Sequence, residues 1–256
     1  MKTSFNVILS FLAAQVCAIP TLYLTGDSTM ALGGGGPRTQ GFGEYLKTSF
    51  KGIRVVNDAF AGRSARSYYN QGRFAAVAAK VVPGDFVLME FGHNDGGPLT
   101  KNEDGRPSCF GGGSETCISP RTGEIVYTYV HYLLEASKLM TAKGAHVVIA
   151  SPTPDNPWES GTFAYSPSRF TWYAKSVAEQ AGPLASFVDH GTYVANIYKS
   201  LGAKVVNSYY PKDHTHTSPE GASTVAAAFM KGLMCGGSPL SAYSKYPMSS
   251  IPGKCV

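Results

Sequence analysis

Five short apolar segments alternate with stretches of helical periodicity, and this alternation constrains the fold more than any other feature of the sequence. Each segment is β-branched or aromatic in character and is bounded by Gly, Pro or a polar turn, which is typical of buried strands. The segments are residues 21–25, 53–57, 85–91, 146–151 and 186–189. Strands that alternate with helices form parallel sheets with helices on both faces. We therefore predict an α/β fold with a five-stranded parallel sheet.

Two of the intervening helices have clear signals. Residues 126–143 have a helical stripe made of Val126, Val130, Leu133, Ser137 and Met140. The last helix is predicted to start after Ser218, an N-cap that is followed by Pro219 and Glu220. Its buried face is predicted to hold Ala222, Val225, Ala226, Phe229 and Leu233.

The first 18 residues have the pattern of a secretory signal peptide. Lys2 gives a positive start, Val7 to Val16 form an apolar run, and the sequence V-C-A ends at Ala18. The apolar run is too short for a membrane anchor, which needs about 20 residues. We predict cleavage after Ala18, an extracellular location, and a single domain over residues 19–256, a length suited to one α/β domain.

Four cysteines remain after cleavage, and an even number in a secreted chain indicates disulfides. Four cysteines allow three connectivities. Local pairs close the shortest loops at the least entropic cost, so we predict Cys109–Cys117 and Cys235–Cys255. The seven-residue gap between Cys109 and Cys117 does not match the spacing of zinc ligands.

The charge distribution argues against a nucleic-acid partner. The net charge is +5, and the loss of Lys2 with the leader would leave +4. The basic residues are scattered and form no stripe. A mild positive charge is compatible with an acidic polysaccharide as partner.

Polar motifs follow the predicted strands, where sites form in parallel sheets. They are G-D-S-T (26–29), D-A-F-A-G-R-S (58–64), G-H-N-D (92–95), P-T-P-D-N-P-W-E (152–159) and, past the fifth strand, D-H-T-H (213–216). Because the ends of parallel strands share one edge of the sheet, we expect these motifs to line one crevice.

Three of these motifs supply the groups needed for acyl transfer. Ser28 is a candidate nucleophile, although it could also simply cap a helix. The backbone N–H groups of Ser28 and Gly62 and the amide of Asn94 could converge on a carbonyl oxygen as an oxyanion hole. Taken singly, Gly62 could be an ordinary turn glycine and Asn94 a buried turn asparagine.

The D-H-T-H motif offers the remaining members of a triad. His216 could accept the Ser28 proton, and Asp213, three residues earlier, could fix its tautomer. His214 is interpreted as a structural or rim residue, with the reversed assignment kept open. Asp27 is expected to support the turn, and Asp189–His190 to contribute packing. A metal cluster at D-H-T-H is the rival hypothesis, but no further ligand set has a recognisable spacing.

The residues Ser28, Gly62, Asn94 and His216 occupy the four positions that name the SGNH (GDSL-type) hydrolases, which this sequence resembles. The stretches G-D-S-T, A-G-R-S-A-R-S, E-F-G-H-N-D-G-G and D-H-T-H-T-S-P-E-G look like those of the rhamnogalacturonan acetylesterases in particular. The match keeps its order along essentially the whole mature chain.

The resemblance implies a flavodoxin-like, three-layer α/β/α fold and an extracellular serine carboxylic-ester hydrolase. Such an enzyme removes acetyl groups from the rhamnogalacturonan of plant cell-wall pectin, with Ser28, Asp213 and His216 as triad. No metal or other cofactor, no membrane partner and a monomeric state are expected. Candidate residues for lining the polysaccharide groove are Trp158, Tyr165 and Arg169.

Two other functional classes are weighed against this one. The protein could remove acetyl groups from another glycan such as xylan, or act as a lipase, although no apolar stretch offers a lid. A non-catalytic carbohydrate-binding protein is the third possibility, but it has no need for a triad together with three oxyanion donors.

Overall fold

The computed structural model describes residues 19–256, so the predicted signal peptide lies outside the described residues. A five-stranded sheet runs through the centre of the molecule in the order β2-β1-β3-β6-β7, with every neighbouring pair parallel. The strands are β1 (Thr21–Gly26), β2 (Arg54–Asn57), β3 (Phe86–Glu90), β6 (His146–Ala150) and β7 (Ala185–Val188). The predicted α/β class and the five parallel strands of the central sheet are confirmed.

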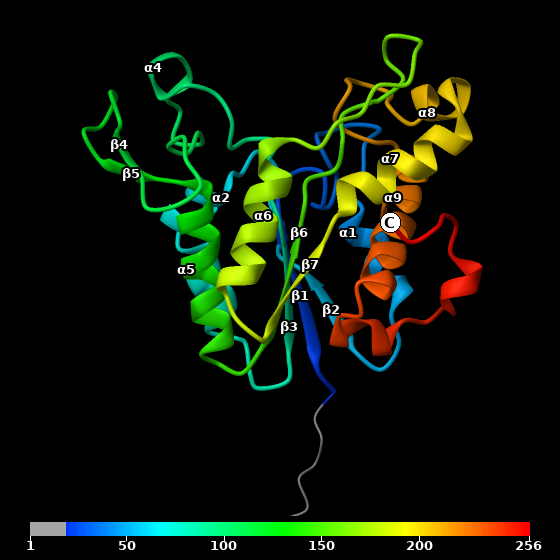
Figure 1. Ribbon diagram of the computed structural model, residues 1–256, viewed down its shortest axis with the longest axis horizontal. Helices are drawn as coiled ribbons and strands as arrows, with labels where there is room; N and C mark the ends of the chain where they lie inside the picture. The colour runs from blue at the N-terminus through cyan, green and yellow to red at the C-terminus, as the bar shows by residue number, and fades with distance from the viewer. Residues whose placement is uncertain (1–18) are drawn as a thin grey trace, which may run out of the picture.

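Helices cover both faces of the sheet and produce three layers (Figure 1). One face carries α2 (Ala65–Asn70), α3 (Arg73–Ala78), α5 (Tyr129–Thr141) and α6 (Arg169–Gln180), and the other α1 (Gly43–Ser49), α7 (His190–Leu201) and α9 (Pro219–Cys235). Shorter helices are α4 (Leu99–Asn102), α8 (Ala203–Ser208), η1 (Pro239–Tyr243) and η2 (Met248–Ser250).

Alternation along the strands divides the core into two hydrophobic layers. Leu22 and Leu24 of β1 face the α1/α7/α9 layer, whereas Tyr23 between them faces the other layer. In β3, Phe86 and Leu88 likewise alternate with Val87 and Met89. These strands are apolar on both faces because both faces are covered.

The sequence placed the α9 boundary correctly and the α5 boundary incorrectly. The Ser218 hydroxyl accepts a hydrogen bond from the Gly221 N–H and caps α9, whose five predicted core residues are all buried. The helix predicted from residue 126 begins only at Tyr129, after the cap Thr128. Val126 belongs instead to β5 (Ile125–Tyr127), which pairs antiparallel with β4 (Thr116–Ile118).

Two disulfides, Cys109–Cys117 and Cys235–Cys255, join neighbouring parts of the chain. The first links the β4–β5 hairpin to the segment that follows α4, and the second links the end of α9 to the C-terminal tail. This is the local pairing expected from loop entropy. Within residues 19–256, no helix is both long and apolar enough to span a bilayer.

Candidate active site

The turn after β1 holds Ser28 at the carboxyl edge of the sheet. β1 ends at Gly26, where an added Cβ would lie 2.8 Å from the Glu90 carbonyl oxygen of the neighbouring strand, so only glycine fits. The Asp27 carboxylate then accepts hydrogen bonds from the Thr29 N–H at 2.9 Å and the Thr29 hydroxyl at 2.8 Å. Asp27 therefore supports the turn, as expected, and Ser28 is presented at its apex.

Ser28, His216 and Asp213 form a continuous hydrogen-bonded chain. The distance from Ser28 Oγ to His216 Nε2 is 2.8 Å, and His216 Nδ1 lies 2.8 Å from Asp213 Oδ2. An ionised carboxylate can only accept, so Nδ1 donates to Asp213 and the lone pair of Nε2 faces the Ser28 hydroxyl. This is the tautomer that a general base for Ser28 requires.

The Asp213 carboxylate is stabilised in its ionised form. Partial burial acts to raise its pKa, but the bond from the His216 ring and those from the His216 and Thr215 backbone N–H groups outweigh burial. They lower the pKa of Asp213 to about 2. A fixed negative charge beside Nδ1 stabilises the imidazolium that forms when His216 takes a proton.

A glycine-rich loop from the N-terminal half holds His216 in place, and the sequence analysis did not identify it. The Gln40 N–H donates to the Thr217 carbonyl at 2.8 Å, and Lys212 Nζ donates to the Gly35 carbonyl at 2.6 Å. An added Cβ on Gly35 would lie 2.4 Å from the His216 ring. The four consecutive glycines at 33–36 were the available signal, because a backbone that must lie flat against a ring excludes side chains.

Gly62 and Asn94 lie in adjoining loops, after β2 and β3. Gly62 has a φ of +72°, so its turn requires glycine for its backbone conformation; an added Cβ would meet open space. One N–H of the Asn94 amide donates to the Arg63 carbonyl at 3.1 Å, and its oxygen accepts from Arg106 Nη1 at 3.2 Å. The amide therefore has a fixed orientation, with one further N–H available.

Comparison with known families finds one match that extends over most of the chain. The model of the GDSL-like Lipase/Acylhydrolase family matches residues 24–223, which include all five of the residues named above as triad members or oxyanion donors. The chain belongs to the GDSL-like Lipase/Acylhydrolase family.

Within this family, the chain is similar to the rhamnogalacturonan acetylesterase of Emericella nidulans. The two are 48% identical over 239 residues, which cover 93% of each chain. Among solved structures, a Bacillus subtilis protein, YxiM, superimposes with a TM-score of 0.66 at 20% identity, over 84% of this chain and 56% of that one. A catalytic mutant of an acetylxylan esterase from Geobacillus stearothermophilus superimposes with a TM-score of 0.56 at 18% identity, over 84% and 94%. At these identities the two structures show that the fold is shared and nothing further.

The other histidines near the crevice differ from His216 in their surroundings. His214 is exposed and lies 3.4 Å from Glu159. His93 lies between Thr153, at 3.2 Å, and Asp155, at 3.7 Å, and joins the loops after β3 and β6. Among residues 19–256, the hydrogen-bond partner of the Ser28 hydroxyl is His216 and neither of these two rings.

His190 belongs to a buried pair, but its partner is Glu90 and not the adjacent Asp189. The Nδ1 of His190 is 2.7 Å from Glu90 Oε2, and its Nε2 is 2.9 Å from the Val225 carbonyl. Asp189 caps α7 and accepts from Thr192 and Ser151. The packing role expected for Asp189–His190 is therefore split: His190 pairs with Glu90 in the core, and Asp189 caps α7.

The three candidate groove residues lie in different surroundings. Tyr165 lines a hollow of about 430 Å³ together with His93, Asp155 and Phe170. Trp158 packs against the core cluster and donates its indole N–H to the Tyr198 carbonyl at 2.9 Å. Arg169 stacks on Phe110 and Phe170 and borders a separate hollow beside α4. A groove role stays a prediction for all three.

The structure offers no support for the rival metal hypothesis at D-H-T-H. Across residues 19–256, no group of three or more His, Cys, Asp and Glu side chains is arranged to hold a metal ion. Asp213 and His216 face each other, whereas His214 points to Glu159.

Proposed function

We propose that this protein is a secreted esterase that removes acetyl groups from the rhamnogalacturonan of pectin through a Ser-His-Asp acyl-enzyme mechanism. The observation that carries the proposal is the chain Ser28–His216–Asp213, with both steps at 2.8 Å. The 48% identity to a rhamnogalacturonan acetylesterase over nearly the full length supports the choice of substrate.

In the first half of the reaction, Ser28 Oγ attacks the acetyl carbonyl carbon while His216 Nε2 accepts the hydroxyl proton. The negative charge that develops on the carbonyl oxygen is stabilised by the Ser28 and Gly62 N–H groups and the Asn94 amide. His216 then donates its proton to the sugar oxygen, the C–O bond breaks, and the acetyl group remains on Ser28.

In the second half, water takes the place of the sugar. His216 accepts a proton from the water as its oxygen attacks the acetyl-Ser28 carbonyl, and the same donors stabilise the oxyanion. The proton returns to Ser28 Oγ as acetate leaves. Side chains and backbone groups supply every step, so the proposed mechanism calls for no cofactor.

Secretion, a single domain over residues 19–256 and a monomeric state are part of the same proposal. The apolar leader supports secretion, and so do the two disulfides, which persist in oxidising compartments. Expression of the full sequence in a secreting host tests this. We expect the enzyme in the medium with Ile19 as its first residue, and sedimentation at the mass of one chain.

The substrate is tested by acetate release from acetylated rhamnogalacturonan, acetylated homogalacturonan and acetylated xylan, with Ser28→Ala as the control. We expect the highest kcat/KM on rhamnogalacturonan. A preference for xylan would replace the substrate and leave the mechanism in place. No release from any ester by the folded protein would overturn both.

A further inference from the structure

Arg63 follows the oxyanion glycine directly and belongs to the same hydrogen-bonded turn. Its N–H donates to the Phe60 carbonyl at 3.3 Å, and its own carbonyl accepts the Asn94 amide at 3.1 Å. Its side chain leads into a hollow of about 560 Å³ that Gly62 also lines. A ligand held in this hollow would therefore lie beside the reacting ester.

The Arg63 guanidinium is held in one orientation by neutral partners. Its Nε donates to Gln71 Oε1 at 2.9 Å, and its Nη1 donates to the Ala61 carbonyl at 3.1 Å. Its Cζ lies over the Phe60 ring, 4.4 Å from the ring centroid. Arg73 lies over the same ring at 4.0 Å and donates to the same Gln71 oxygen. Two arginines thus share one aromatic ring and one amide.

Within residues 19–256, neither Arg63 nor Arg73 forms an ion pair with a carboxylate, because the nearby carboxylates are engaged elsewhere. Asp104 pairs with Arg106. Partial burial, followed by repulsion from Arg73 and Arg106, lowers the pKa of Arg63. Arg63 is therefore a cation at the wall of the hollow without an ion-pair partner among the described residues; the two carboxylates that also line the hollow, Asp104 and Glu124, pair with Arg106 and Arg66.

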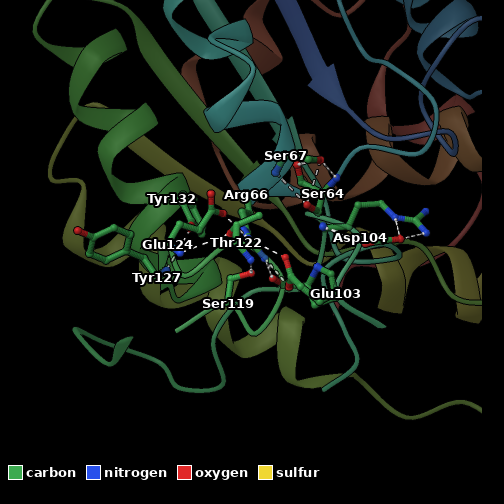
Figure 2. A network of polar contacts seen from close by, with 12 residues as sticks. Ser64, Arg66, Ser67, Glu103, Asp104, Ser119, Thr122, Glu124, Tyr127 and Tyr132 are labelled. Atoms are coloured by element: carbon green, nitrogen blue, oxygen red, sulfur yellow. Dashed lines mark hydrogen bonds and ion pairs between the residues drawn. The ribbon is translucent and has the colours of Figure 1, made fainter. Parts of the chain in front are cut away.

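An ion-pair network around the buried Arg66 adjoins the hollow through Glu124, which is one of its lining residues (Figure 2). The fully buried Arg66 donates to Glu103 at 3.0 Å and to the Pro107 carbonyl at 2.8 Å, and it also contacts Glu124. These contacts tie α2 to the segment after α4 and to the β4–β5 hairpin. If either glutamate turned toward Arg63, the buried Arg66 guanidinium would lose one of its two ion-pair partners, which is costly.

We propose that Arg63, with Arg73 beside it, forms a carboxylate-binding subsite that seats an acidic sugar unit next to the acetylated unit. This inference rests on the proposed function and names the chemistry by which the site would recognise an acidic polymer. Arginine forks bind carboxylates with two hydrogen bonds, and a guanidinium that is already oriented loses little entropy on binding. The hollow beside Gly62 then sets which stretch of polymer reaches Ser28.

The experiment measures kcat/KM for acetate release from acetylated rhamnogalacturonan oligosaccharides, which are acidic, and from acetylated neutral xylo-oligosaccharides. The quantity of interest is the acidic-to-neutral ratio. We expect Arg63→Gln to lower this ratio by about tenfold, in line with the loss of a charge-assisted bond at a half-exposed site. Arg63→Lys keeps the positive charge but loses the planar guanidinium, so its acidic-to-neutral ratio should lie between those of the wild type and Arg63→Gln. The matched control Arg54→Gln, at the opposite edge of the sheet, should leave the ratio unchanged.

An unchanged ratio in Arg63→Gln would overturn the subsite, and so would an equal loss on both substrates, which would assign Arg63 to support of the turn. A binding experiment tests the subsite independently of the proposed function. Calorimetry measures the binding of deacetylated galacturonate oligosaccharides to Ser28→Ala protein. We expect weaker binding when Arg63→Gln is added to Ser28→Ala. Equal binding in the two proteins contradicts the subsite even if the enzyme deacetylates another polymer.

Discussion

Two histidine–carboxylate pairs in this molecule have nearly equal distances but different surroundings: one lies in the core beside Phe42 and Phe229, and the other in the loop before α9. The His216–Asp213 distance is 2.8 Å and the His190–Glu90 distance is 2.7 Å. The far nitrogen of His216 faces a serine hydroxyl, whereas that of His190 faces the Val225 carbonyl. A backbone carbonyl can only accept a hydrogen bond, so it requires a protonated ring nitrogen. A serine hydroxyl can donate its proton to an unprotonated ring nitrogen. The group on the far nitrogen therefore distinguishes the histidine that we propose as general base from the one in the core.

The two pairs also differ in solvent exposure: the His216–Asp213 pair is partly exposed and the His190–Glu90 pair is buried. The His216 and Asp213 side chains are 21% and 35% exposed, and those of His190 and Glu90 are 0% and 1% exposed. Burial raises the pKa of Glu90, although the nearby His190 opposes the shift, whereas hydrogen bonds lower that of Asp213. One pair is accessible to substrate, and the other contributes to the core between β3 and α9.

The largest expected effect is the loss of kcat when His216 of the exposed pair, or its partner Ser28, is replaced. Ser28→Ala and His216→Ala should each lower kcat by about 10⁴-fold or more, because the nucleophile or its base is lost. Acetate release measures this, and circular dichroism should show an unchanged fold. His214→Ala is the matched control and should keep most of the activity. Equal losses in His214→Ala and His216→Ala would reverse the assignment within D-H-T-H.

Replacement of a residue of the buried pair should lower the free energy of unfolding. His190→Ala should lower it by about 3–5 kcal/mol, since it opens a cavity and leaves a buried carboxyl group without its partner. Urea denaturation measures this, with His216→Ala as the control that should change stability by less than about 1 kcal/mol. If both variants lost equal stability, the distinction between the pairs would fail.

A smaller effect is expected from Arg106, which acts through Asn94. Arg106→Met should lower kcat by about tenfold, because the Asn94 amide loses the bond that fixes its orientation; full removal in Asn94→Ala should cost about 10²–10³-fold. KM for a small acetyl ester should stay close to wild type, since only the transition state uses the amide. A rise in KM with constant kcat would assign Arg106 to substrate binding.

The smallest expected effect is on acid stability. The pKa of Asp213 is about 2 in the folded protein, below its ordinary value of 3.8, so its stabilising contribution is present above pH 4 and is lost as the pH falls toward 2. Because the group is partly exposed, we expect less than about 1 kcal/mol. The difference in unfolding free energy between wild type and Asp213→Asn should shrink over this range. A difference that grows with acid would contradict the sign.

The sheet and the contact between Asp213 and His216 could be predicted because their signals are local. Each strand was placed within two residues, and Asp213 and His216 are separated by one turn of chain. The β4–β5 hairpin was missed because each strand has only three residues and lies largely at the surface without regular alternation. Val126 was consequently assigned to the following helix.

The contact between Ser28 and His216 spans 188 residues and was predicted from motifs that follow the strands, but other long-range partners had no such signal. Glu90 and His190 are 100 residues apart, and Gly35 and His216 are separated even further along the chain. The available signal for Glu90 was a carboxylate at the end of an otherwise apolar strand, F-V-L-M-E. A buried charge implies a partner but does not name it. The anchoring of Asn94 by Arg106 had no signal of its own, because the loop that carries Arg106 is positioned by the buried Arg66.

The close packing of Gly35 against the His216 ring offers a way to separate recognition from turnover. A single added methyl group at this position has no room unless the imidazole swings aside, yet the side chains of Ser28, Asp213 and His216 are all retained. A Gly35→Ala protein is thus a design for an inert, lectin-like reagent that would hold acetylated polysaccharide without consuming it.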